Sequence, residues 1–298
     1  MSMAGGYHKA VERAAAVQCD CVQIFTAPPR QFSISQGGAR SGAALAKHDN
    51  LWRAKLIAPA EAEQFRTALR EQGIKHPLAH DGYLINLASP DAPLWKKSID
   101  AFVEELLRAE LLGIPYVVAH PGAYTTSSEE RGLKRIAEGL DEVHRQTKGI
   151  AAQCLLETTA GQGSNLGWRF EHLAEIISLA KHPDRLGICF DTCHVFAAGY
   201  ALATKKDYLA TMRALDDTAG LEKVKAFHVN DSKAKFGSRV DRHAHIGQGV
   251  MTLEPFRFLM NDRRFRRVPM YMETPKGTEQ NVDCDILNLR TLRGLIAG

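Results

Sequence analysis

Short apolar runs alternate along this chain with longer segments in which apolar residues recur every three or four positions. The short runs have the length and composition of buried β-strands. They are Cys21–Thr26, His76–His80, Pro115–His120, Gln153–Glu157, Leu186–Asp191, Val224–Val229 and Pro269–Glu273. The longer segments have the period of amphipathic helices, and they are Ala60–Gln72, Ser98–Leu112, Glu129–Lys148, Phe170–Lys181 and Tyr208–Ala219. Such alternation over the whole length is typical of parallel strands linked by helices.

Capping residues support several of these helix boundaries. Ser98, followed by Asp100, and the stretch Ser127–Glu130 supply polar and acidic side chains at two predicted helix starts. Gly73, Gly113 and Gly149 stand where a C-terminal cap belongs.

The repeat spacing favours a (β/α)₈ or TIM barrel over residues 1–298 as a single domain. A doubly wound open sheet is the alternative, but no glycine-rich phosphate-binding fingerprint follows an early strand. Only seven strands are predicted, because Met1–Gly6 leads almost at once into a helix, Tyr7–Val17. Either the first barrel strand is missing from this chain, or the barrel is open there. A Gly-, Ala- and Ser-rich insertion at about 33–50 (Ser33–Asn50) is predicted to be a long loop.

Composition changes this picture little. The chain is 45% hydrophobic and 24% charged, as in ordinary globular proteins, and no apolar run is long enough to cross a bilayer. Charged residues near the N-terminus interrupt any signal-peptide core, and the six cysteines form neither CxxC pairs nor a small disulfide scaffold. We therefore expect a cytoplasmic protein, and we separately expect a monomer. The net charge of +4 would suit a polyanionic partner, although many metabolic enzymes are equally basic.

Imidazole and carboxylate side chains stand at the carboxyl ends of the predicted strands. In a TIM barrel these ends open onto the one face that carries active sites. The residues are His80, His120, Glu157, Asp191, His194, His228 and Glu273, with Asp241 and His243 in a following loop. Asp241 and His243 are two positions apart and face the same way if the segment is extended.

So many ligand-type side chains at one mouth require cations to neutralise them. A mixture of nitrogen and oxygen donors suits zinc or manganese better than calcium or magnesium. The set suffices for two or three ions if one carboxylate bridges. Any single strand-end histidine is more often a hydrogen-bonded core residue, so the prediction rests on the joint pattern. His245 shares the facing of His243, and Cys193 stands between two predicted ligands, so both are alternative donors.

Several stretches closely resemble the endonuclease IV family. They are His80–Leu87, His120-Pro-Gly122, Glu157-Thr-Thr-Ala-Gly-Gln-Gly-Ser-Asn-Leu-Gly167, Asp191-Thr-Cys-His194 with Ala197–Tyr200, His228-Val-Asn-Asp231 and Arg239-Val-Asp-Arg-His243. The similarity runs from Ser2 to about Pro275. The resemblance implies a TIM barrel that holds three zinc ions and cleaves the phosphodiester on the 5′ side of abasic sites in double-stranded DNA.

The resemblance also implies how the ligands divide among the ions. His80, His120 and Glu157 would hold one, and Glu157 would bridge to a second. Asp191, His228 and Glu273 would complete the second ion, and His194, Asp241 and His243 would hold the third. Glu157 and Glu273 are the candidate catalytic carboxylates. Bound metal lowers the pKa of water from about 15.7 towards 7, so no side-chain nucleophile is required. Mn²⁺ is an alternative ion at some positions.

Candidate DNA contacts follow from the same resemblance. Tyr83 matches a position that inserts near the lesion, and Arg30 resembles part of an element that wedges into the base stack. The insertion after Arg30 divides that element, so the DNA-facing loop is expected to be remodelled. Lys233, Arg239 and Arg242 flank the predicted ligands and are candidate phosphate contacts.

Two other functions fit parts of the pattern. A sugar isomerase or epimerase of the xylose-isomerase type would use Glu157, Asp191, His228 and Glu273 around a single ion. The five remaining candidate ligands would then have no purpose. The second alternative is a DNA-binding homologue that has lost activity, against which an intact ligand set argues.

Overall fold

The computed structural model describes residues 1–26 and 56–297. Arg30 and the predicted insertion at about 33–50 lie outside these residues, and so do the predictions made for them.

A parallel sheet of seven strands forms the centre of the described structure, in the order β1-β2-β3-β4-β5-β6-β9. The strands are β1 (Cys21–Phe25), β2 (His76–His80), β3 (Tyr116–Ala119), β4 (Gln153–Glu157), β5 (Leu186–Asp191), β6 (Val224–His228) and β9 (Met270–Tyr271). The strand number and the parallel barrel architecture agree with the prediction. β9 is shorter than the predicted Pro269–Glu273, because its ladder with β6 contains only Met270 and Tyr271.

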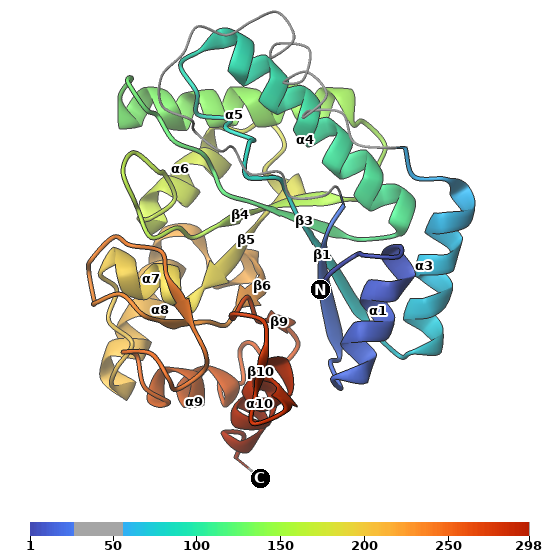
Figure 1. The fold of residues 1–298 in the computed structure, drawn as a ribbon. Helices are drawn as coiled ribbons and strands as arrows, with labels where there is room; N and C mark the ends of the chain where they lie inside the picture. Colours follow the sequence, from blue (N-terminus) through green and yellow to red (C-terminus); the bar gives the residue numbers. More distant parts are fainter. Residues whose placement is uncertain (27–55, 298) are drawn as a thin grey trace, which may run out of the picture.

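Helices surround the strands, as Figure 1 shows. They are α1 (Tyr7–Ala16), α3 (Pro59–Glu71), α4 (Ala92–Leu112), α5 (Glu129–Gln146), α6 (Phe170–Leu179), α7 (Thr192–Ala198), α8 (Lys205–Ala219), α9 (Glu254–Met260) and α10 (Cys284–Gly294). Two short 3₁₀ turns, Pro183–Arg185 and Leu221–Lys223, lead into β5 and β6. No helix among the described residues is both long and apolar enough to cross a membrane.

The start of α4 corrects one predicted helix boundary. The N-cap is Asp91, whose carboxylate accepts a hydrogen bond from the backbone N–H of Leu94 at 2.7 Å. Ser98, the predicted start, lies inside the helix, and its hydroxyl donates to the carbonyl of Leu94 at 2.9 Å. A proline in the first turn is compatible with this earlier start, because its missing N–H would have no helical partner there. Gly113 is the left-handed C-cap that the sequence predicts, with φ of 73°.

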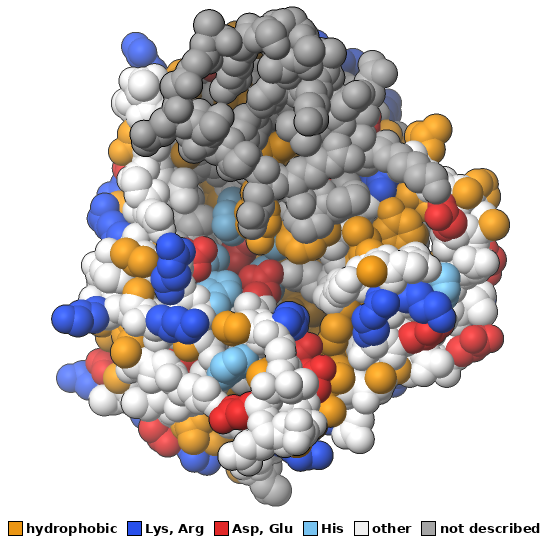
Figure 2. All heavy atoms as spheres, in the orientation of Figure 1, with side chains coloured by type: hydrophobic (Ala, Val, Ile, Leu, Met, Phe, Trp, Pro, Cys, Tyr) orange, Lys and Arg blue, Asp and Glu red, His pale blue; other side chains and the backbone are white. Residues whose placement is uncertain are grey.

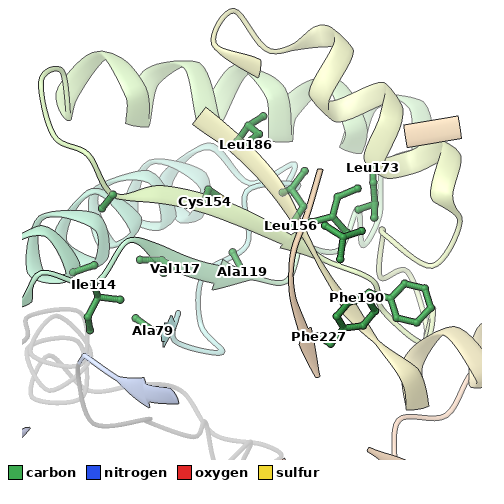
Figure 3. Packing of buried hydrophobic residues seen from close by; sticks show 14 of the residues in the cluster. Ala79, Ile114, Val117, Ala119, Cys154, Leu156, Leu173, Leu186, Phe190 and Phe227 are labelled. Atoms are coloured by element: carbon green, nitrogen blue, oxygen red, sulfur yellow. The ribbon is translucent and has the colours of Figure 1, made fainter. Parts of the chain in front are cut away.

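The strands bury two apolar faces. One face packs against the surrounding helices, and Figure 3 shows part of it, including Val117, Leu156 and Phe190. The other face forms a smaller cluster inside the barrel, made of Leu78, Val118, Leu155, Cys189, Ala226 and Tyr271, with Cys21 beside it. Since residues two apart on a strand point the same way, the next inward layer begins two positions further along. That layer is Gln23, His80, His120, Glu157, Asp191, His228 and Glu273.

Side chains join the two strands at the ends of this order. The thiol of Cys21 in β1 donates to the carbonyl of Met270 in β9 at 3.2 Å. The amide nitrogen of Gln23 donates to Glu273 Oε1, just after β9, at 2.6 Å. The backbone carbonyl of Gln23 accepts a hydrogen bond from the ammonium of Met1 at 2.6 Å. The described residues therefore form a nearly closed barrel with a seam between β1 and β9 that side chains bridge.

Candidate metal centre

The predicted ligands converge at the carboxyl-end mouth of the barrel in three groups. In each group the donor atoms of all members lie within 4.8 Å of one another. The groups are His80, His120 and Glu157; Glu157, Asp191, His228 and Glu273; and His194, Asp241 and His243. These are the same three sets that the family resemblance implies.

Glu157 connects the first two groups. Its carboxylate is completely buried, and its Oε2 lies 3.1 Å from Nε2 of His80 and 3.1 Å from Nε2 of His120. The other oxygen, Oε1, lies 2.8 Å from Nδ1 of His228. Ligand atoms around a tetrahedral zinc ion are separated by about 3.3 Å, given metal–ligand bonds of about 2.0 Å. One oxygen therefore faces each group at a spacing that suits a bridging carboxylate.

The second group collects its members from β5, β6 and the end of β9. Nδ1 of His228 lies 3.4 Å from Oε2 of Glu273 and 3.9 Å from Oδ2 of Asp191. Oδ1 of Asp191 also accepts the backbone N–H of His194 at 2.8 Å, which makes Asp191 the N-cap of α7. Asp191 is therefore both the N-cap of α7 and a member of the second ligand group.

The third group depends on a small hairpin. Strands β7 (Asp231–Ser232) and β8 (His243–Ala244) pair antiparallel, and the loop between them carries Asp241. Asp241 lies between two imidazoles, with Oδ2 3.2 Å from Nε2 of His194 and Oδ1 3.2 Å from Nε2 of His243. As predicted, Asp241 and His243 face the same way. Nε2 of His243 is buried without a hydrogen bond, so its lone pair is free for a cation.

The second nitrogen of each of four imidazoles is held by an oxygen outside the groups. For His80 and His194 this nitrogen is Nδ1, which lies 3.0 Å and 2.9 Å from the backbone carbonyls of Asp81 and Thr158. Nδ1 of His243 lies 3.3 Å from the carbonyl of Glu273. For His228 it is Nε2, 2.7 Å from the side-chain Oε1 of Gln23. Metal-binding histidines are commonly oriented in this way.

The electrostatics of the cluster favour bound positive charge. Burial opposes ionisation of Glu157, but the imidazoles around it hold the pKa of its carboxyl well below the usual range. Burial likewise disfavours charged imidazoles, yet neighbouring carboxylates raise the pKa of His80 and His194 well above the usual range. For His228, Cys189 together with the carboxylates of Glu273 and Glu157 raises the pKa well above the usual range. Cations at this mouth would satisfy the same carboxylates and displace those protons.

The donor set fits zinc or manganese. Neutral nitrogen and carboxylate oxygen are ligands of both ions, and the spacing and orientation above suit them. Of the alternative donors, Cys193 forms a further group with Asp191 and His243, whose donor atoms also lie within 4.8 Å of one another. Burial raises the pKa of its thiol to about 12, so without a metal ion it is a neutral thiol. His245 lies outside all the groups, and its Nδ1 is 3.0 Å from the side-chain amide nitrogen of Asn288.

A cavity of about 430 Å³ opens directly over the groups. Figure 2 shows histidine and acidic side chains gathered in this hollow, with Lys and Arg side chains along one side. Tyr83 lines it and remains 61% exposed, with its ring centroid 5.9 Å from that of Phe25. An exposed tyrosine at the rim of a polar cavity is accessible to a large ligand.

The predicted phosphate contacts differ in their surroundings. Arg242 lines the cavity, and Lys233 is exposed where the hairpin loop begins. Arg239 is exposed as well, but its guanidinium carbon lies 3.7 Å from the centroid of the Trp168 ring, a cation–π contact. Arg239 therefore fastens the hairpin loop to the loop after β4.

Sequence reasoning missed two amides that hold the ligand groups. Asn230 Nδ2 donates to Oδ2 of Asp191 at 2.7 Å, and its Oδ1 accepts the backbone N–H of Glu273 at 2.7 Å. Gln23 contacts both His228 and Glu273. The signal for Gln23 was available, since it follows an inward-facing apolar residue by two positions, as His80 and Glu157 do.

Comparison with known proteins identifies the class first. The family model described as "Xylose isomerase-like TIM barrel" matches residues 11–292. A D-psicose 3-epimerase from Clostridium cellulolyticum, solved with D-tagatose, has this fold, with a TM-score of 0.62 at 14% identity over 97% of this chain and 86% of that one. At that identity the likeness concerns the fold alone.

Two closer similarities define the family within this class. A probable endonuclease 4 from Geobacter sp. (strain M21) is 44% identical over 100% of this chain and 98% of its own length. The crystal structure of endonuclease IV from Thermus thermophilus has a TM-score of 0.81 at 36% identity, covering 99% of this chain and 96% of that one. The chain belongs to the endonuclease IV family.

Proposed function

We propose that this protein is a zinc-dependent endonuclease that hydrolyses the phosphodiester 5′ to abasic sites in double-stranded DNA, as in base excision repair. The observation that carries the proposal is the set of three adjoining ligand groups, two of them sharing Glu157, beneath one open cavity. Two metal ions held side by side suit in-line displacement at phosphorus. The names of its relatives support the same activity.

Each ligand group would hold one zinc ion, with Mn²⁺ as an alternative at some positions. When bound, such ions polarise the phosphate and lower the pKa of water to near 7. The chain's own residues fix the geometry. Glu157 sets the separation of two groups, Glu273 and Asp191 face the second, and the hairpin brings Asp241 and His243 to the third. We assign Glu157 and Glu273 as the catalytic carboxylates on this basis.

Substrate binding would use the rim of the cavity. Arg242 and Lys233 offer cations to the DNA backbone, and Tyr83 offers an exposed ring to the gap left by a missing base. Hydrolysis leaves a 3′-hydroxyl and a 5′-deoxyribose phosphate. We further propose that the chain acts as one barrel domain, as a monomer in the cytoplasm.

Metal content and nicking test the proposal together. The purified protein should contain close to three zinc ions per chain by inductively coupled plasma analysis. It should nick a duplex with one abasic site without added magnesium and leave the matched intact duplex uncut. One manganese ion or fewer per chain, with no nicking, would refute the assignment. Epimerisation of a ketose by the same preparation would instead support the sugar-isomerase alternative.

Single substitutions test two of the groups separately. His120→Ala and His243→Ala should each lower the nicking rate by more than about 100-fold, since loss of a direct ligand should cost more than loss of an outer hydrogen-bond partner. If either variant kept wild-type activity, the assignment of that histidine as a metal ligand, and with it the proposed multi-metal site, would be wrong.

A further inference from the structure

The inward-facing layer at the mouth contains one residue that belongs to none of the ligand groups. Six of its seven positions carry candidate ligands. Four of them end β2, β4, β5 and β6, whereas His120 lies one residue beyond β3 and Glu273 two residues beyond β9. The seventh position, on β1, is Gln23. An uncharged amide at the level of the ligands can reach them without competing for a cation.

Gln23 makes two short contacts, both with members of the second group. Its Oε1 lies 2.7 Å from Nε2 of His228, and its Nε2 donates to Oε1 of Glu273 at 2.6 Å. The remaining donor atoms of the two partners, His228 Nδ1 and Glu273 Oε2, face each other at 3.4 Å within the group. The amide therefore contacts the outer atom of each ligand and leaves the inner atom free.

The chemistry of these groups allows only one orientation of the amide. An ionised carboxylate accepts hydrogen bonds and cannot donate them, so the NH₂ of Gln23 must face Glu273. The carbonyl oxygen then faces His228, and Nε2 of that imidazole must carry a proton to donate to it. In a neutral imidazole this leaves Nδ1 with a lone pair, directed at the group.

We propose that Gln23 is a positioning residue that fixes the tautomer of His228 and selects which oxygen of Glu273 is available to a metal ion. The proposal rests on the function proposed above and deepens it. The position of Gln23 is itself constrained, since its backbone carbonyl accepts the Met1 ammonium and the neighbouring Cys21 reaches across to Met270. Its role would be confined to the second group, because its contacts are with His228 and Glu273.

Two variants separate the two contacts. Gln23→Leu removes both hydrogen bonds at similar volume, whereas Gln23→Glu keeps an acceptor for His228 but loses the donor to Glu273. Each should weaken one of the bound zinc ions by about 10–100-fold, as for other outer partners of metal ligands. The measurement is competition with a chromophoric zinc chelator on the isolated protein, without DNA. Gln153→Leu is the matched control, because Gln153 is a half-buried glutamine at the opposite end of strand β4.

Activity gives a second readout that a purely structural defect would not produce. With Gln23→Leu, kcat for the abasic duplex should fall at limiting zinc and recover at saturating zinc, with KM unchanged. His228→Ala should not recover. Side-chain ¹⁵N shifts of the zinc-loaded wild type should also identify His228 as protonated at Nε2.

Three outcomes would overturn the proposal: unchanged zinc affinity in a folded Gln23→Leu variant, a loss shared equally by all three ions, or a proton on Nδ1 of His228. Failure of the wild type to bind zinc or nick DNA would instead overturn the proposed function itself. Thermal melting of each variant beside Gln153→Leu shows whether a change in affinity reflects unfolding.

Discussion

Buried histidines in this chain differ in the hydrogen-bond partners of their ring nitrogens. His80, His194 and His228 have oxygen partners on both nitrogens, and all three stand at the mouth of the barrel. His144 in α5 is equally buried, but neither of its nitrogens has a hydrogen-bond partner. The two kinds should respond differently to substitution and to pH.

The two ends of β2 each carry a histidine, and comparing them tests the role of the buried histidines at the mouth of the barrel. His80→Ala removes a buried candidate ligand, whereas His76→Ala removes an exposed imidazole at the other end of the same strand. Because only His80 faces the ligand groups, its loss should lower the nicking rate by more than about 100-fold. His76→Ala should retain activity within about twofold. Equal losses in steady-state assays would contradict the assignment.

His144 should make the protein sensitive to acid. Burial lowers its pKa to about 4, below the unfolded value of about 6.5, so the unfolded chain binds this proton first. The stability that comes from keeping His144 neutral is present above pH 6.5 and is lost as the pH falls towards 4. His144→Leu should therefore exceed the wild type in stability by about 2 kcal/mol more at pH 5 than at pH 7.5.

Urea unfolding of both proteins at the two pH values measures this difference. The titration of the metal centre contributes equally to both proteins and therefore cancels. His76→Leu is the control, since it makes the same replacement at a histidine that is exposed on the surface. If the wild type and the His144→Leu variant lost stability in parallel between pH 7.5 and pH 5, the lowered pKa of His144 would be contradicted.

At the scale of elements, the hairpin of β7 and β8 is held by one carboxylate. Asp231 accepts backbone N–H groups from Ser232, Gly247, Gly249 and Met251, at 2.7 to 3.1 Å. A buried carboxylate with four donors is fully satisfied, so it fixes the loop that follows β8. The position of His243, a candidate ligand on β8, depends on this arrangement.

Gly249 is the point at which this arrangement can be tested. A Cβ atom there would lie 2.3 Å from Oδ1 of Asp231 and 2.4 Å from the carbonyl of Ser232. Gly249→Ala should therefore cost about 1–3 kcal/mol of stability by overpacking. Gly82→Ala is the control, because nothing lies within 4 Å of a Cβ at that position. Thermal melting that showed equal, small effects would mean that the loop can shift without cost.

Periodicity predicted the strands well because each is a short apolar run, and six of the seven predicted runs lead into a candidate ligand. It predicted the short helices poorly. The segment Thr192–Ala198, for which no helix was predicted, is α7, and its N-cap is Asp191. Asp191 is both a candidate ligand at the end of β5 and the N-cap of α7, and only its place at the end of the strand was recognised from the sequence. Gln23 was missed for a related reason, since its function depends on contacts across the barrel with residues that lie more than 200 positions away.

For the whole molecule, the metal centre should contribute to stability. The three groups draw on most strands of the barrel and on the hairpin, so bound ions would tie these elements together. Removal of metal by a chelator should lower the Tm by more than about 5 °C, and added zinc should restore it. His80→Ala should show a smaller drop. A Tm that does not respond to chelation in the wild type would contradict a role of the ions in folding.

A side-chain hydrogen bond between Gln23 and Glu273 crosses the seam between β1 and β9. Both residues belong to the layer that faces the candidate ions. If an ion in the second ligand group favours contact across the seam, contact across the seam must favour binding of that ion by the same amount of free energy. An ion held by His228 and Glu273 would then stabilise the contact across the seam. A substitution that stabilises this contact would raise the affinity for the ion.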